Sequence, residues 1–186
     1  MPAWGLANSA ATLVGQNLGA GKPERAERAT WLTGLYNMAF MGAVTVAFLA
    51  LAPQLVAIFT ESPGTHGIGT RALRTLAYGY VFYAWGMVVA QAFNGAGDTT
   101  TPTRLNFVCF WCLQIPLAWT LAHPVGLGPD GVFWSVCGAE SVLALAAIAL
   151  FRRGRWKEAR IAPDVATAVA TGTAERGEAK APSAAP

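Results

Sequence analysis

Five side chains between positions 80 and 94 have the types and spacing of a surface for flat, apolar cations. They follow one another at steps of 3, 4, 4 and 3 residues, so an α-helix would place them on one face. Aromatic rings attract cations, and methionine adapts to ligands of varied shape. Packing between helices, with the amides hydrogen-bonded internally, explains the same stripe, and the sequence leaves both interpretations open. The stripe consists of Tyr80, Tyr83, Met87, Gln91 and Asn94.

Glu140 is a carboxylate in the middle of an apolar stretch, from Gly131 to Phe151. A charge at the centre of a bilayer costs a few kcal/mol, so this side chain should face other helices or a wet cavity, or be protonated. It is therefore a candidate proton or cation site. The alternative is a neutral acid that is hydrogen-bonded to a neighbouring helix.

Motifs of enzymes are missing from the sequence. Cys109 and Cys112 have CxxC spacing, but they lie inside an expected apolar helix rather than at the start of a soluble one. The chain has no GxxxxGK or HExxH motif and no cysteine spacing typical of a metal site. We therefore expect no enzymatic activity and no cofactor or metal.

The elements that position these side chains follow from long runs without charge. There are 32 uncharged residues between Arg28 and Glu61, 23 between Arg74 and Asp98, and 25 between Arg104 and Asp130. About 20 apolar residues cross the hydrocarbon as a helix, whereas barrel strands would be shorter and would alternate. The composition, 54% hydrophobic and 12% charged, agrees. The fold class expected is an all-α, polytopic membrane protein whose main partner is the lipid bilayer.

Glycine, proline and charge at the connections predict five transmembrane helices. Residues 1–160 would form this membrane lobe. Residues 161–186 are rich in Ala, Pro, Thr, Gly and Glu, and we expect them to be a disordered cytoplasmic tail. The helices are expected near Ala3–Leu18, Ala29–Thr60, Thr75–Ala96, Leu105–Ala122 and Gly131–Phe151.

Positive charge is distributed unevenly between the two sides of such a bundle. One side has two basic residues, Arg71 and Arg74, and the other has nine. Positively charged loops stay in the cytoplasm, which predicts a multi-pass protein of the cytoplasmic membrane with a cytoplasmic C-terminus. Because the basic residues mark the ends of spans rather than one solvated stripe, we expect no nucleic-acid partner. The nine are Lys22, Arg25, Arg28, Arg104, Arg152, Arg153, Arg155, Lys157 and Arg160.

Four segments, three at helix ends and one inside a helix, together resemble one transporter family. They are the run VGQNLGAGKPERA from Val14 to Ala26, the run NGAGDT from Asn94 to Thr99 followed by Pro102, the IPL of Ile115 to Leu117, and the FRRGRW of Phe151 to Trp156. In this order, they resemble the C-terminal half of a multidrug and toxic compound extrusion (MATE) transporter. The resemblance covers about Pro2 to Arg160, and the five helices would correspond to the eighth through twelfth.

The resemblance implies two six-helix lobes and the efflux of small cationic or amphipathic drugs, coupled to inward movement of protons or sodium. It also implies that the N-terminal lobe and the seventh helix are missing from this sequence, so that the missing lobe or a second chain would be a partner. No coupling carboxylate transfers by motif, because Tyr83, Ala84 and Trp85 stand where some members have an acidic residue. A lipid-linked saccharide flippase and a non-transporting scaffold or remnant are the alternatives; a flippase should have Arg or Lys inside its helices, and these have none.

Overall fold

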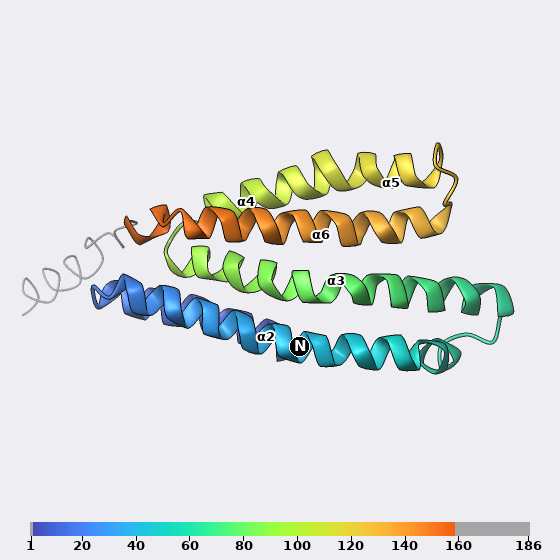
Figure 1. Ribbon diagram of the computed structural model, residues 1–186, viewed down its shortest axis with the longest axis horizontal. Helices are drawn as coiled ribbons and strands as arrows, with labels where there is room; N and C mark the ends of the chain where they lie inside the picture. The colour runs from blue at the N-terminus through green and yellow to red at the C-terminus, as the bar shows by residue number, and fades with distance from the viewer. Residues whose placement is uncertain (1, 159–186) are drawn as a thin grey trace, which may run out of the picture.

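Long helices joined by short turns make up residues 2–158, the part of the chain that the computed structural model describes (Figure 1). The fourth helix runs without interruption from 100 to 122 and has a π-helical middle, and a short 3-10 turn follows the last helix. The tail expected at residues 161–186 lies outside the described residues. The elements are α1 (Pro2–Gly19), α2 (Pro23–Ala57), α3 (Pro63–Gly95), α4 (Thr100–Asn106), η1 (Phe107–Gln114), α5 (Ile115–Ala122), α6 (Pro129–Arg152) and η2 (Arg155–Glu158).

Four of these helices are long and apolar enough to cross a membrane: α2, α3, the continuous helix 100–122, and α6. The all-α, multi-pass membrane fold predicted from the sequence is thus confirmed. The segment expected as a further span forms α1, a helix of 18 residues. It is not among the four, because polar side chains such as Asn8, Gln16 and Asn17 lower its hydropathy.

The helices extend beyond the apolar runs from which they were predicted. α3 begins at Pro63 instead of Thr75 and continues through Arg71 and Arg74. Its 33 residues correspond to about 50 Å, well over the ~30 Å of hydrocarbon, so one end reaches beyond the apolar layer. At that end Arg71 Nε donates to the carboxylate of Asp130, at the start of α6, at 3.1 Å. The helix therefore continues through polar residues beyond the uncharged run, and a prediction based on the length of that run places its start too late.

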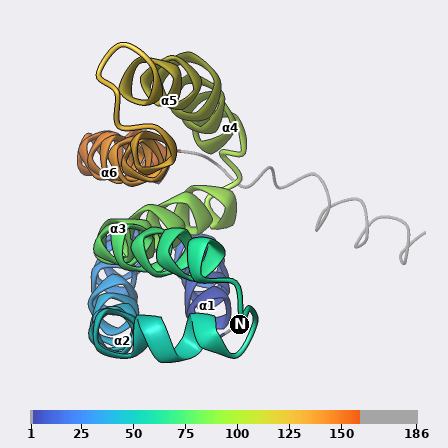
Figure 2. The same ribbon diagram turned by 90° about the vertical axis from the view of Figure 1, so that its right-hand side faces the viewer.

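α3 is the central helix of the bundle. It packs against α1 and α2 on one side and against α6 on the other. Figure 2 shows this order along the bundle, with the helix 100–122 as the outer layer, packed on α6. Residues on α3 therefore face either the α1–α2 pair or α6, which matters for the stripe at positions 80–94.

Small residues allow the helices to approach closely. A Cβ at Gly95 on α3 would overlap the backbone of Ala11 on α1, and one at Gly34 on α2 would overlap the ring of Trp85. Side chains also hydrogen-bond across helices: Asn37 Nδ2 donates to the Ala84 carbonyl at 3.1 Å, and Thr45 Oγ1 to the Ala77 carbonyl at 3.0 Å. Close backbone approach and such bonds hold helices together where lipid removes the hydrophobic drive.

The π-helical segment Phe107–Gln114 ends two residues before Pro116. Proline inside an α-helix removes one backbone hydrogen bond, and its ring collides with the carbonyl four residues earlier, here that of Cys112. Hydrogen bonds between residues five apart widen the helix in the turns that precede this proline. The helix 100–122 thus passes Pro116 without breaking.

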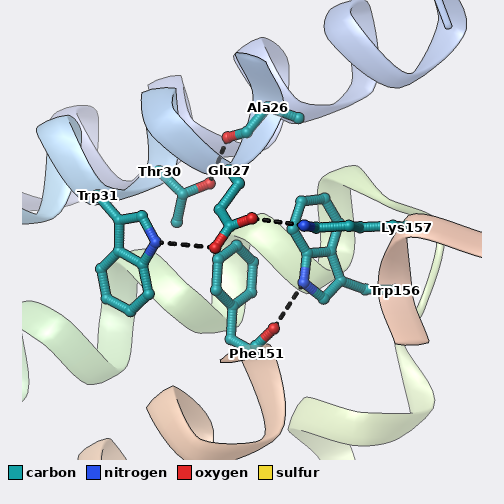
Figure 3. A network of polar contacts seen from close by, with 7 residues as sticks. All are labelled: Ala26, Glu27, Thr30, Trp31, Phe151, Trp156 and Lys157. Atoms are coloured by element: carbon teal, nitrogen blue, oxygen red, sulfur yellow. Dashed lines mark hydrogen bonds and ion pairs between the residues drawn. The ribbon is translucent and has the colours of Figure 1, made fainter. Parts of the chain in front are cut away.

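The last described residues fold back onto the start of α2 (Figure 3). Lys157 Nζ pairs with Glu27 Oε2 at 2.5 Å, and Trp31 Nε1 donates to Glu27 Oε1 at 3.3 Å. Trp156 is buried and stacks on Phe151 with ring centroids 4.5 Å apart, and its Nε1 donates to the Phe151 carbonyl at 2.8 Å. We call Glu27, Trp31, Phe151, Trp156 and Lys157 the end cluster. It joins η2 and the end of α6 to α2.

Candidate functional site

Three residues of the stripe, Tyr80, Tyr83 and Met87, line one cavity of about 740 Å³. The cavity lies between α1, α2 and α3, and we call it the aromatic cavity. Its volume falls within the range of sites for drug-sized molecules. The other lining residues are Pro2, Ala3, Trp4, Phe40, Met41, Val44 and Phe48.

The lining of the aromatic cavity suits an apolar cation. It has five aromatic rings and two thioethers, and it contains neither a basic nor an acidic side chain. Tyr80 packs against Phe48 with ring centroids 5.8 Å apart, so α2 and α3 both present rings to the same space. The faces of such rings attract a cation, and Met41 and Met87 can adapt to ligands of different shape.

Gln91 and Asn94 do not line the aromatic cavity. They lie one and two turns closer to the end of α3, where Asn94 Nδ2 donates to Gln91 Oε1 at 3.1 Å. The stripe predicted from helical spacing therefore divides, because α3 is longer than the cavity. Three side chains face the cavity, and the two amides share one hydrogen bond outside it.

Glu140 lies in the interior of the bundle, half-buried, at a second cavity of about 180 Å³ between α3 and α6. We call this the carboxylate cavity; Leu76, Gly79 and Val136 complete its apolar wall. Tyr80 and Tyr83 line it too, so two tyrosines separate Glu140 from the aromatic cavity. Within the described residues Glu140 forms no ion pair. A proton would therefore stabilise it there, as would a cation.

The sequence did not reveal which residues of α1 and α2 face the stripe. Trp4, Phe40, Met41 and Phe48 line the aromatic cavity, but they are apolar residues in apolar helices. Their spacing is that of any core or lipid-facing position, so no signal separated them from their neighbours. The proximity of Glu140 to Tyr80 and Tyr83 was equally hidden, because it depends on how α6 packs on α3.

Comparison with known proteins places this arrangement in a family. A family model described as MatE matches residues 1–120. The chain is 30% identical over 168 residues to the "Probable multidrug resistance protein NorM" of Pseudomonas aeruginosa, a match that covers 86% of this chain and 33% of that protein. It is 29% identical over 166 residues to the protein of that name from Caulobacter vibrioides, with 87% of this chain and 34% of that protein covered.

A solved structure shares the fold. It is described as the inward-facing conformation of a multidrug resistance MATE family transporter of the MOP superfamily. The TM-score is 0.78 at 25% identity, and the match covers 87% of this chain and 37% of the other. The chain thus spans about a third of the length of the proteins that it matches. With the family model matched over residues 1–120 and the helical bundle shared with a solved MATE transporter, the chain belongs to the MatE family.

Proposed function

We propose that this chain forms most of the C-terminal lobe of a multidrug efflux antiporter, which exports small cationic or amphipathic drugs across the cytoplasmic membrane in exchange for protons or sodium ions. The observation that carries the proposal is the aromatic cavity of about 740 Å³, with its five rings, two methionines and no charged side chain. The relatives named as probable multidrug resistance proteins support the same function.

Glu140 is the proposed coupling residue. Tyr80 and Tyr83 line both cavities, so a cation bound against these rings would lie close to the Glu140 carboxylate. A proton on Glu140 removes its negative charge and weakens the attraction for the drug, whereas a bound drug cation favours loss of the proton. Drug and proton, or drug and sodium ion, would therefore compete for this region without any cofactor.

The remaining partner is a second lobe, present either in a longer polypeptide or as another chain. The relatives are about three times as long as the matched region, which leaves room for that lobe. Trp4 and Tyr83 of the aromatic cavity are both partly exposed in this chain, at 54% and 36%. A second lobe packed beside α1 and α3 would close the cavity around its ligand.

The cavity can be tested with ethidium as the cation, added to the full chain in detergent micelles and followed by its fluorescence. Replacing Tyr83, which is 36% exposed, with alanine should raise the dissociation constant about 2- to 5-fold, because one cation–π contact at a partly exposed site is worth about 0.5–1 kcal/mol. The control is Tyr36→Ala, which removes a tyrosine of α2 that is 61% exposed and lines neither cavity. We expect no change for this control.

Two outcomes of this titration would contradict the proposal. If the chain does not bind ethidium, or if both tyrosine variants bind like the original, the aromatic cavity is not a drug site. Glu140→Gln belongs to the same titration and should retain ethidium binding but abolish its dependence on pH. A pH dependence identical to that of the original chain would remove Glu140 from the coupling mechanism.

The proposed orientation, with η2 and the start of α2 in the cytoplasm, predicts a pattern of thiol labelling. In a chain whose Cys109, Cys112 and Cys137 are replaced by serine, Thr65→Cys should react with a membrane-impermeant maleimide added to intact cells. Lys22→Cys should react only after the membrane is permeabilised. Both positions are exposed and lie at opposite ends of α2 and α3, so accessibility alone would not separate them. The reverse pattern would invert the topology.

A further inference from the structure

Three arginines line a third cavity, of about 420 Å³, at the end of the bundle that carries the end cluster. Arg104 comes from α4, Arg153 follows the end of α6, and Arg155 begins η2. The chain turns between the last two at Gly154, whose φ is 75°, a value that favours glycine and places both arginines at one cavity. We call this space the arginine cavity. Its position is separate from the aromatic and carboxylate cavities.

The lining of the arginine cavity has an excess of positive charge, with three arginines and one carboxylate. Asp98 is the one carboxylate in its lining, and both of its oxygens already accept hydrogen bonds at the start of α4. Thr101 N donates to Oδ1 at 3.0 Å, and Thr101 Oγ1 donates to Oδ2 at 2.6 Å. Among the described side chains, none of the three arginines forms an ion pair; the pairs present are Arg71 with Asp130 and Lys157 with Glu27.

The floor of the arginine cavity is apolar. Phe93, Leu150 and Trp156 line it, and the Trp156 indole N–H is occupied by the Phe151 carbonyl. A ligand here would therefore place a negatively charged group against guanidinium groups and an apolar part against rings and a leucine. Planar guanidinium groups bind phosphate oxygens through two parallel hydrogen bonds, which makes a phosphate group the fitting anion.

We propose that the arginine cavity binds the phosphate group of an acidic membrane phospholipid. Arg104, Arg153 and Arg155 hold the phosphate, while Phe93, Leu150 and Trp156 contact the glycerol and the first carbons of the acyl chains. Arg104 and Arg153 adjoin the ends of two apolar spans, at the level where lipid headgroups lie. Basic pockets between transmembrane helices at this level are suited to anionic headgroups. Free phosphate has the same anionic chemistry, but it leaves the apolar floor uncovered.

The proposal is tested on the full chain in dodecylmaltoside micelles by titrating dioleoylphosphatidylglycerol and recording the midpoint of thermal unfolding. We expect saturable stabilisation, and no comparable effect of dioleoylphosphatidylcholine, which carries no net charge. In the triple variant Arg104→Gln, Arg153→Gln, Arg155→Gln, the lipid concentration for half-maximal stabilisation should rise at least tenfold, given a roughly fivefold contribution from each charge at a membrane surface. The matching triple lysine variant retains the charges, loses the paired hydrogen bonds and should lie between the two.

The control removes the same number of positive charges from the same end of the bundle. Lys22, Arg25 and Arg28 are exposed and do not line the arginine cavity, so their triple glutamine variant should respond to phosphatidylglycerol almost as the original chain does. An equal loss in this control, or equal stabilisation by phosphatidylcholine, would overturn the proposal in favour of general charge or detergent effects. Stabilisation by inorganic phosphate at the same concentration would identify a site for the free anion and overturn the assignment to lipid.

If the triple variant cannot be purified, the three single variants test the same cavity. Arg104→Gln alters α4 only, at an exposed position, and should raise the half-maximal lipid concentration about threefold to fivefold. An unchanged value in all three single variants would contradict the site. None of these lipid measurements depends on drug transport, so their outcome does not depend on whether the aromatic cavity binds a drug.

Discussion

Replacing Trp156 with alanine is expected to lower the free energy of unfolding by about 3 to 5 kcal/mol, the usual cost of deleting a buried tryptophan. The indole is 2% exposed and stacks on Phe151 at 4.5 Å, at an interplanar angle of 10°. Its removal leaves a void that the neighbouring rings cannot fill without moving. Lys157 is the next residue, so the loss also weakens the pairing of Lys157 with Glu27 and frees η2 from α2.

The free energy of unfolding is measured by titrating the full chain in mixed micelles with dodecyl sulfate. Two further variants separate the contributions of the hydrogen bond and of ring burial. Trp156→Phe retains the stacking and loses the hydrogen bond to the Phe151 carbonyl, which should cost about 1 kcal/mol. Trp119→Ala deletes a tryptophan that is 60% exposed on the helix 100–122, and its effect should stay below about 1 kcal/mol. Equal losses at positions 119 and 156 would show that the end cluster contributes no specific packing.

Substituting alanine for Gly95 should destabilise the chain by about 3 kcal/mol, against the ordinary trend for helices. Inside a helix, alanine is normally better than glycine by about 1 kcal/mol. At Gly95, however, the added Cβ would overlap the Cα, carbonyl carbon and oxygen of Ala11. These are backbone atoms, so no side chain can turn aside and α1 must separate from α3. Because α1 forms one wall of the aromatic cavity, that cavity would lose its shape as well.

The sign of the effect at Gly95 is checked against Gly42, in the middle of α2, where an added Cβ meets nothing within 4 Å. Gly42→Ala should stabilise the chain by about 0.5–1 kcal/mol in the same dodecyl sulfate unfolding experiment. The approach of α1 to α3 would be refuted if both substitutions stabilised the chain to the same extent.

The fold could be predicted from the sequence because charge is excluded from hydrocarbon. The uncharged runs located the spans, but they could not locate the helix ends: α3 begins at Pro63 because a helix continues into water wherever its backbone hydrogen bonds allow. The polar side chains of α1 lower its mean hydropathy below that of the four candidate spans, although α1 packs against both α2 and α3. The π-helical turns at Phe107–Gln114 had no recognisable signal apart from Pro116.

The candidate site was visible only along one helix. Helical spacing correctly put Tyr80, Tyr83 and Met87 on a common face, because residues three and four apart are neighbours on any helix. Spacing cannot say how far along the helix a cavity extends, and so Gln91 and Asn94 were grouped with the other three. It also cannot show which helices complete the cavity, since that depends on glycines such as Gly95 that set the distance between α3 and α1. Their use as a drug site stays a prediction.

The π-helical segment allows the helix 100–122 to lose one residue without a change in the register of the residues that follow. A chain one residue shorter between Phe107 and Gln114 could change from π- to α-helical hydrogen bonding there and still present Ile115–Ala122 to α6 in the same register. α3 has no π-helical turn that could absorb a deletion, because it is α-helical from Pro63 to Gly95. There a deletion would rotate every later residue by about 100° and carry Tyr83 and Met87 away from the aromatic cavity. The outer helix of this bundle thus tolerates a one-residue deletion that the central helix cannot accommodate.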